Sequence, residues 1–209
     1  VPVLENFGFR VLAEIPIELE GEAQAHIHDC LLDLSDSMAI DEVLSRAKVI
    51  EQAIADVLSG KAENDPFNQL VLYAGLEPRP VVWLRAWFRY MRQTGVAFSV
   101  ATVVDALRRA PKATAALIGL FRAAHDPKVA NGREASVKAA SAAFEDALKD
   151  VRGIDDDRIL RQMRTVVSAT LRTNAFAPAA VEALAFKINS KEVPGLPAPV
   201  PYREIWVYR

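Results

Sequence analysis

The spacing of apolar residues changes twice along this chain, and these changes limit which folds it can adopt. Over residues 14–20 apolar and polar side chains alternate, which is typical of a β-strand with one apolar face. From Ile40 to about Asn174 the apolar residues recur every three to four positions, as in amphipathic helices. Alternation then returns. The sequence therefore predicts an α+β fold that is predominantly α-helical, with an N-terminal β-hairpin, about seven helices and a C-terminal β extension.

The hairpin is expected from two runs, FGFRVLAEIPIELE and AHIHDCLLDL, with a turn at Gly21 between them. Pro16 has no N–H to donate to a ladder, which places its half of the first strand at a sheet edge. Ser35, Asp36 and Ser37 offer side chains that can cap the helix that follows. We therefore interpret residues 1–36 as a hairpin domain.

The middle of the chain, residues 37–178, is expected to be helical. Its most hydrophobic helix carries apolar side chains around most of its circumference, which favours a central, buried position. Only Arg85, Arg89 and Arg92 form a polar stripe on it, and we interpret that stripe as a packing feature or a possible interface. The expected helices cover approximately residues 40–58, 66–74, 79–93, 100–107, 111–125, 137–151 and 155–171.

Residues 179–209 form the predicted β extension. LAFKINS alternates in polarity, PGLPAPVP must be extended because it holds four prolines, and REIWVYR is a compact β run. A strand needs a neighbour. The last run therefore either pairs back with Leu184–Ile188 or pairs with sequence beyond Arg209.

One strand raises the question of a metal site. His26, His28 and Cys30 alternate along the second predicted strand, so their side chains share a face and could act as three zinc ligands. The alternative is an ordinary half-buried strand, which we favour because the chain has no second cysteine to complete a structural site. His125 lies near a helix end, where partial positive charge is favourable. We predict no metal ligands and no catalytic residues.

Composition and glycine spacing exclude several classes of function. The nine glycines lie at least thirteen residues apart, so neither a dinucleotide fingerprint nor a P-loop is present. A net charge of −2 argues against nucleic-acid binding, and the apolar runs are too short to cross a membrane. A single cysteine fits a reducing compartment, so we expect a cytoplasmic location.

Four long stretches resemble the large bacterial NAD-specific glutamate dehydrogenases. They are GKAENDPFNQLVLYAGL, LRAWFRYMRQTGVAFS, DDDRILRQMRTVVSATLRTN and FKINSKEVPGLPAPVPYREIWVY, in that order from Gly60 to Tyr208. In that family, ACT-like regulatory domains and helical segments precede the catalytic domain. The resemblance implies a segment just upstream of the catalytic domain and running into its start. The chain's first residue, Val1, fits such a fragment.

The resemblance also implies a function for the longer polypeptide. That enzyme would convert L-glutamate, NAD and water to 2-oxoglutarate, ammonium and NADH, as a homo-oligomer. The glycine- and lysine-rich catalytic motifs of the family have no counterpart here, so we expect neither activity nor a cofactor in this segment. It would link the regulatory and catalytic regions and support subunit contacts. The alternative is a free-standing regulatory module that binds a small molecule such as an amino acid.

Overall fold

A computed structural model describes residues 2–19, 25–34, 40–129 and 131–209 of the chain. The chain divides into two compact units, with the boundary between Pro78 and Arg79. The described residues confirm a predominantly helical α+β fold with an N-terminal hairpin and a C-terminal sheet. Within these residues, every helix is too short or too polar to cross a membrane.

The first unit contains the predicted hairpin. Strand β1 (Phe9–Leu19) pairs antiparallel with β2 (Ala25–Leu34), and the expected turn at Gly21 lies outside the described residues. Strand β1 begins two residues after the start of the expected run, and Pro2–Asn6, before that run, forms a short helix, α1. Gly8 lies in the turn between α1 and β1, and its φ of +92° favours glycine. A Cβ at Gly8 would also lie 2.4 Å from the Tyr73 ring.

The helix expected over residues 40–58 is two helices, α2 (Ile40–Ser45) and α3 (Ala47–Leu58). Arg46 lies at the break, and its guanidinium donates hydrogen bonds to the carbonyls of Val71 and Leu76. These bonds fix the junction to a distant part of the same unit. The predicted caps at residues 35–37 lie outside the described part of the chain.

The helix expected over residues 66–74 begins as a 3₁₀ turn, Pro66–Asn68, and continues as α4 (Gln69–Tyr73). The Asp65 carboxylate accepts a hydrogen bond from the Phe67 N–H at 3.0 Å, as expected for a capping residue before a proline. The helix therefore starts at the expected residue, although its first turn is tighter than an α-helix.

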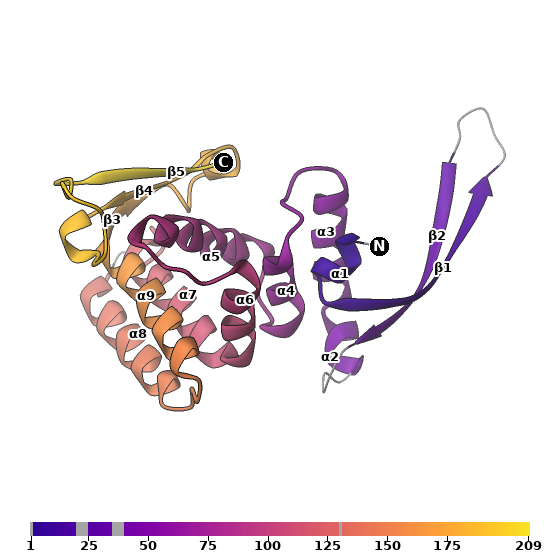
Figure 1. Ribbon diagram of the computed structural model, residues 1–209, viewed down its shortest axis with the longest axis horizontal. Coiled ribbons are helices and arrows are strands. Elements are labelled where there is room, and N and C mark those ends of the chain that lie inside the picture. The colour runs from indigo at the N-terminus through magenta and orange to yellow at the C-terminus, as the bar shows by residue number, and fades with distance from the viewer. Residues whose placement is uncertain (1, 20–24, 35–39, 130) are drawn as a thin grey trace. The chain divides into compact units, whose positions relative to one another are not determined.

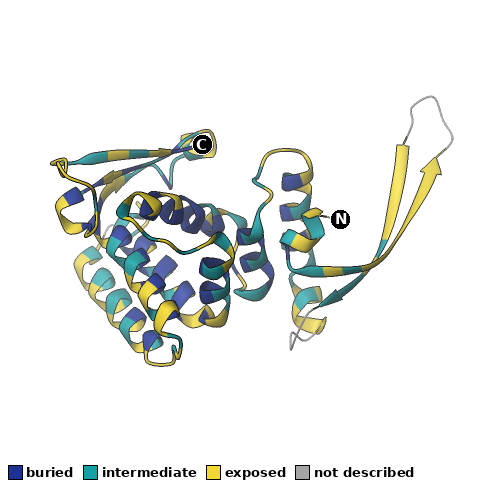
Figure 2. Ribbon diagram, viewed as in Figure 1, coloured by how far each residue is buried: buried dark blue, intermediate teal, exposed yellow. Residues whose placement is uncertain are grey.

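The second unit is a helical bundle with a small sheet on one side (Figure 1). Helix α7 packs against α6, α8 and α9, and α6 also packs against α9. Figure 2 shows α5 dark blue along most of its length, as expected for a helix that is apolar nearly all round. The α-helices of the second unit are α5 (Pro78–Met91), α6 (Val100–Arg109), α7 (Pro111–His125), α8 (Arg133–Leu148) and α9 (Ile154–Ala169).

Aromatic rings from three parts of the second unit meet around Phe121 of α7. Trp83 and Trp87 of α5 have ring centroids 4.9 and 5.0 Å from that of Phe121. Phe176 and Phe186 lie 5.8 and 6.1 Å from it. These separations allow favourable ring packing in addition to apolar burial. We call these five residues the aromatic core.

The C-terminal sheet is antiparallel, in the order β3 (Thr170–Thr173), β4 (Leu184–Ile188) and β5 (Glu204–Tyr208). The last run therefore pairs back with β4, which was one of the two alternatives. Strand β3 was missed, because the last predicted helix was extended to residue 171. That helix ends at Ala169, and the Thr170 hydroxyl donates to the Val166 carbonyl at 2.8 Å.

The proline-rich connection to β5 lies close to the end of α5. Residues 92–94 form a 3₁₀ turn after α5, and the remaining 3₁₀ turns lie at Pro178–Val181 and Ser190–Glu192. Gly195 has a φ of +87°, and a Cβ there would lie 2.6 Å from the Thr94 carbonyl oxygen. Only glycine fits this close backbone approach without a shift.

Replacing Trp87 by alanine should destabilise the chain strongly, because this fully buried ring packs within the aromatic core. We expect a loss of about 3–5 kcal/mol in the free energy of unfolding, measured by urea denaturation. The control is Tyr202→Ala, because Tyr202 is an exposed aromatic residue. Equal effects of the two substitutions would contradict a central role for α5.

Candidate functional site

The structure places His26, His28 and Cys30 on one face of the hairpin. In the register, Cys30 lies opposite Glu14 and His28 opposite Pro16. The His28 Nδ1 and Glu14 Oε1 atoms are 2.8 Å apart, so the imidazole of His28 already contacts a carboxylate on the other strand. Among the described residues, no group of three or more histidine, cysteine or acidic side chains could hold a metal ion.

The structure places the three arginines of the predicted stripe in different surroundings: Arg85 and Arg89 lie on α5, and Arg92 lies in the 3₁₀ turn that follows it. Arg85 is only 2% exposed, because α5 is packed on almost every side, whereas Arg89 and Arg92 are exposed. The Arg89 guanidinium carbon lies 5.2 Å from the centre of the Tyr208 ring of β5. The possible interface stays a prediction, and only Arg89 and Arg92 are placed to contribute to it.

His125, the last residue of α7, does not provide positive charge at the helix end, so that expectation was wrong. Burial, followed by the nearby Arg133 guanidinium, lowers the pKa of His125 to about 4. Arg133 instead donates hydrogen bonds to the carbonyls of Ala123, Ala124 and Asp126. The permanently charged guanidinium of Arg133 therefore donates to the carbonyl groups at this helix end, and the imidazole of His125 is neutral at pH 7.

A bidentate ion pair joins the end of α6 to the first turn of α9. Arg109 Nε and Nη2 donate to the two carboxylate oxygens of Asp156 at 2.9 and 2.7 Å. The Asp156 side chain is 10% exposed and that of Arg109 is 56% exposed. The hydrogen bonds from Arg109 hold the pKa of Asp156 below its ordinary value. This pair fixes two helices that are distant in sequence.

A hollow of about 970 Å³ adjoins this ion pair, between the α6–α7 turn, the end of α8 and the start of α9. Its lining combines apolar side chains with both signs of charge, and Lys112 and Asp150 form a second pair there at 3.6 Å. The hollow therefore presents no excess of one charge to a ligand. The charged residues that line it are Arg109, Lys112, Asp150, Arg152, Asp155 and Asp156.

A second polar contact joins α5 to β5. The Tyr90 hydroxyl donates to Glu204 Oε2 at 2.7 Å, and the Ser190 hydroxyl donates to the same oxygen at 3.2 Å. The Trp206 ring packs edge-on against Tyr90 at 5.8 Å. Burial, followed by the Glu204 carboxylate, raises the pKa of Tyr90, so its hydroxyl stays protonated and keeps donating. The contact holds the last strand against the central helix.

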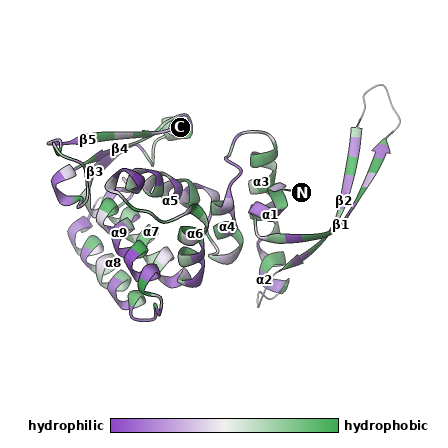
Figure 3. Cartoon of the chain, in the orientation of Figure 1, coloured by the Kyte–Doolittle hydropathy of each residue, from purple (hydrophilic) through white to green (hydrophobic). Residues whose placement is uncertain are grey.

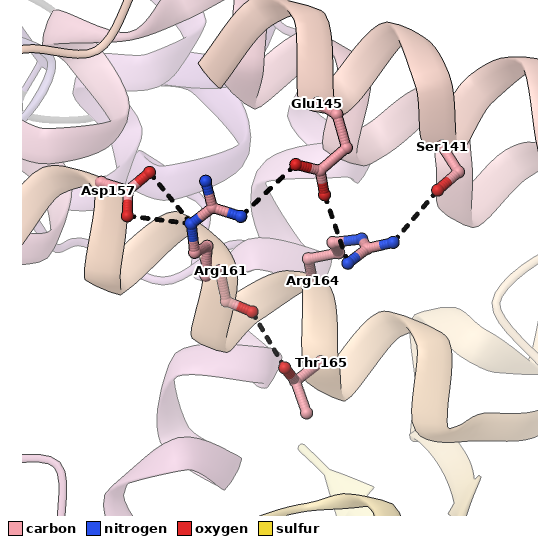
Figure 4. Close-up of polar contacts among 6 residues, drawn as sticks. All are labelled: Ser141, Glu145, Asp157, Arg161, Arg164 and Thr165. Atoms are coloured by element: carbon pink, nitrogen blue, oxygen red, sulfur yellow. Dashed lines mark hydrogen bonds and ion pairs between the residues drawn. The ribbon is translucent and has the colours of Figure 1, made fainter. Parts of the chain in front are cut away.

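A third polar network lies on the surface between α8 and α9 (Figure 4). Glu145 of α8 forms ion pairs with Arg161 and Arg164 of α9, each at 3.3 Å, and Arg161 also pairs with Asp157 at 2.9 Å. Arg164 donates to the Ser141 hydroxyl at 3.1 Å. Because these charges are half-exposed, each pair adds little stability, and the network mainly fixes the relative register of the two helices.

The three polar contacts position helices and a strand, and each of their charges has a partner of opposite sign or a hydrogen-bond donor. Sequence reasoning missed the roles of Tyr90, Glu204 and Asp156. Asp156 is one of three consecutive carboxylates in the first turn of α9, a pattern that gives no sign of its partner Arg109. Glu204 carried one signal, since it shares a strand face with the aromatic residues Trp206 and Tyr208, and the structure shows that this face is the less exposed one.

Three protein-family models match consecutive parts of the chain, and each describes part of a glutamate dehydrogenase. Residues 1–43 match the ACT3 domain of glutamate dehydrogenase. Residues 62–127 match its helical motif 3. Residues 143–209 match the catalytic domain of bacterial NAD-glutamate dehydrogenase. The ACT3 match includes the hairpin, and the other two matches fall mostly within the second unit.

The chain is also similar to curated proteins along its whole length. It is 35% identical to the NAD-specific glutamate dehydrogenase of Pseudomonas aeruginosa, over 100% of this chain. It is 34% identical to the proteins of the same name from Halomonas elongata and Mycobacterium tuberculosis, over 99% and 100% of this chain. The chain belongs to the large bacterial NAD-specific glutamate dehydrogenase family. It spans only 13–14% of the length of these relatives.

Tyr90→Phe should weaken the attachment of β5, because it removes one of two hydroxyl donors to the half-buried Glu204 carboxylate. We expect a loss of about 1.5–3 kcal/mol in unfolding free energy, with faster amide hydrogen exchange across β5. Tyr202→Phe is the matched control. Unchanged exchange in Tyr90→Phe would show that apolar packing alone holds the strand.

Asp156→Asn should lower stability by about 1–2 kcal/mol at pH 7, a figure reduced for the exposure of Arg109. Since the folded pKa of Asp156 lies below 3.8, its ordinary value, the pair stabilises the fold above that pH. The stabilisation disappears as pH falls through the folded pKa, so the two proteins should converge in acid.

Thermal unfolding of the two proteins between pH 3 and 7 measures this difference. Asp155→Asn is the control, because Asp155 occupies the same helix turn and lines the same hollow but is exposed. If Asp155→Asn gives the same pH dependence, the effect arises from the helix dipole and not from Arg109.

Proposed function

We propose that this chain is a non-catalytic segment of an NAD-specific glutamate dehydrogenase and that it holds the start of the catalytic domain against a helical support. The observation that carries this proposal is the composition of the second unit. Residues 79–209 form one compact unit that includes most of the helical motif 3 match and the whole catalytic-domain match. The two matched regions therefore share one core.

The contacts between the two matched regions support a positioning role. Phe121 lies in the helical motif match and Phe186 in the catalytic-domain match, with ring centroids 6.1 Å apart. The ion pair from Arg109 to Asp156 and the hydrogen bond from Tyr90 to Glu204 also cross between the regions. Separating the regions would expose apolar rings and leave a buried carboxylate without its partner, which is costly.

The activity of the longer polypeptide is proposed from its relatives. They are named as NAD-specific glutamate dehydrogenases, so we propose that the whole enzyme uses NAD to oxidise L-glutamate to 2-oxoglutarate and ammonium. The segment itself has no clustered glycines for a dinucleotide, and we propose that it is inactive alone. We further propose a cytoplasmic homo-oligomer in which Arg89 and Arg92 lie near a subunit contact.

The test compares glutamate-dependent NADH formation by the full-length polypeptide and by the 209-residue segment. We expect turnover in the full-length protein, none in the segment, and reduced turnover in full-length Tyr90→Phe. Full-length Tyr202→Phe serves as the control for the substitution. Turnover by the segment alone, or its absence from the full-length protein, would contradict the proposal.

A further inference from the structure

The hollow beside the Arg109–Asp156 pair is lined by two parts of the chain that are far apart in sequence. The α6–α7 turn and the start of α7 form one part of the lining, and the end of α8 and the start of α9 form the other. The first part lies within the helical motif 3 match and the second within the catalytic-domain match. In Figure 1 the α8–α9 connection lies at the end of the helical bundle away from the C-terminal sheet. A molecule bound in the hollow would therefore contact both matched regions.

The bidentate pair holds this lining together. Arg109 Nε donates to an Asp156 carboxylate oxygen at 2.9 Å, and the Asp156 side chain is only 10% exposed. Gly153 leaves room for that carboxylate, because a Cβ there would lie 2.8 Å from an Asp156 carboxylate oxygen. The hollow is therefore formed by the fold itself, as ligand sites usually are.

Two charged side chains of the lining are left without a partner. The bidentate pair uses two of the six charged residues that line the hollow, and Lys112 is paired with Asp150 at 3.6 Å. Within the described part of the chain, the side chains of Arg152 and Asp155 have no hydrogen-bonding or ion-pairing partner, and both residues are exposed. The hollow therefore offers one free cation and one free carboxylate to a ligand.

Much of the remaining lining is apolar. Ile154 lies between the two free charges in the sequence and is 88% exposed, which is unusual for a large aliphatic side chain. Figure 3 shows hydrophobic and hydrophilic residues mixed along α8 and α9. A ligand with an apolar part gains free energy by covering such atoms, while the charged groups fix its orientation. The apolar residues of the lining are Ala110, Pro111, Ala113, Ala147, Val151 and Ile154.

The two free charges define the class of ligand. An anion alone would pair with Arg152 and leave the carboxylate of Asp155 to oppose it, and a cation alone would meet the reverse situation. A molecule with one carboxylate and one ammonium group satisfies both side chains. The α-amino acids carry these two groups on one carbon atom. The apolar lining favours a hydrophobic side chain on that carbon over the second carboxylate of glutamate, for which no free cation remains in the lining.

We propose that the hollow binds a free α-amino acid with a hydrophobic side chain, whose carboxylate pairs with Arg152 and whose ammonium group pairs with Asp155. The side chain of the ligand packs against Ile154 and the apolar lining. A volume of about 970 Å³ accommodates even an aromatic amino acid together with water. Because the ligand contacts both matched regions, its binding stabilises the second unit. The site goes beyond the proposed function, since binding requires neither the longer polypeptide nor turnover.

Calorimetric titration of the 209-residue chain with L-phenylalanine and two analogues tests both pairings. 2-Phenylethylamine lacks the carboxylate, and 3-phenylpropanoate lacks the ammonium group. Arg152→Gln should weaken binding of L-phenylalanine and 3-phenylpropanoate by about tenfold or more, but not binding of 2-phenylethylamine. Asp155→Asn should weaken binding of L-phenylalanine and 2-phenylethylamine by a similar factor, but not binding of 3-phenylpropanoate. L-Glutamate should bind the unaltered chain more weakly than L-phenylalanine does.

The matched controls are Lys149→Gln and Asp157→Asn. Each removes a charge of the same sign close to the substituted residue in sequence, from a side chain that does not line the hollow. Lys149 and Asp157 each form an ion pair on the surface, with Asp146 and Arg161. Both variants should bind L-phenylalanine within about twofold of the unaltered chain, and circular dichroism should show the same helical content in all four.

The apolar contact has its own test in the same titration. Ile154→Ser should weaken binding of L-phenylalanine severalfold, because the aromatic ring of the ligand loses the aliphatic surface that it covers. Val181→Ser is the control, since Val181 is 87% exposed and lies outside the hollow. Equal affinities of the two variants would overturn the packing of the ligand against Ile154.

Two results would overturn the site as a whole. One is the absence of saturable binding of L-phenylalanine to the 209-residue chain at millimolar concentrations. The other is binding that Arg152→Gln and Asp155→Asn leave unchanged, because the amino acid would then bind elsewhere on the chain. If an analogue binds too weakly to titrate, the affinities of the two variants for L-phenylalanine decide. Glutamate-dependent turnover does not enter these measurements, so the proposed function can fail while the site holds, and the reverse.

Discussion

The second unit depends on the burial of α5 against Phe121. This helix is apolar on nearly every side, so it is stable only when other elements surround it. Helix α7 supplies Phe121, and the C-terminal sheet supplies Phe186 to the same core. Residues matched to the helical motif and to the catalytic domain therefore bury each other's aromatic rings, and neither region has a complete core by itself.

Polar contacts fix the orientation of the elements that this apolar packing brings together. Burial of aromatic rings is not strongly directional, whereas the hydrogen bond from Tyr90 to Glu204 and the bidentate pair of Arg109 with Asp156 each require one geometry. Together they select the register of β5 on α5 and of α9 on α6. A segment that positions one domain relative to another needs this combination of a stable core and oriented contacts.

Elements with strong local signals were predicted from the sequence, and elements set by distant contacts were not. The helices expected from residues 100 and 111 begin at those residues, because their start signals, a capping hydroxyl at Ser99 and a proline at Pro111, are local. Strand β3 was missed because Thr170 pairs with Ile188, eighteen residues away. Arg85 was interpreted as part of a polar stripe with a packing or interface role, and its almost complete burial was not predicted, because periodicity reports polarity along a helix but not how many of its sides are covered. The partners of Asp156 and Glu204 were not predicted either, because periodicity gives no information about contacts with distant parts of the chain.

The close approach of Gly195 to the Thr94 carbonyl has a mechanical consequence. The connection to β5 contacts the turn after α5, and β5 itself contacts the last turns of the same helix through Tyr90 and Arg89. The strand and the segment that leads to it are thus both attached to the same end of α5. A substitution that displaces this end of α5 would therefore move β5 and the segment before it together.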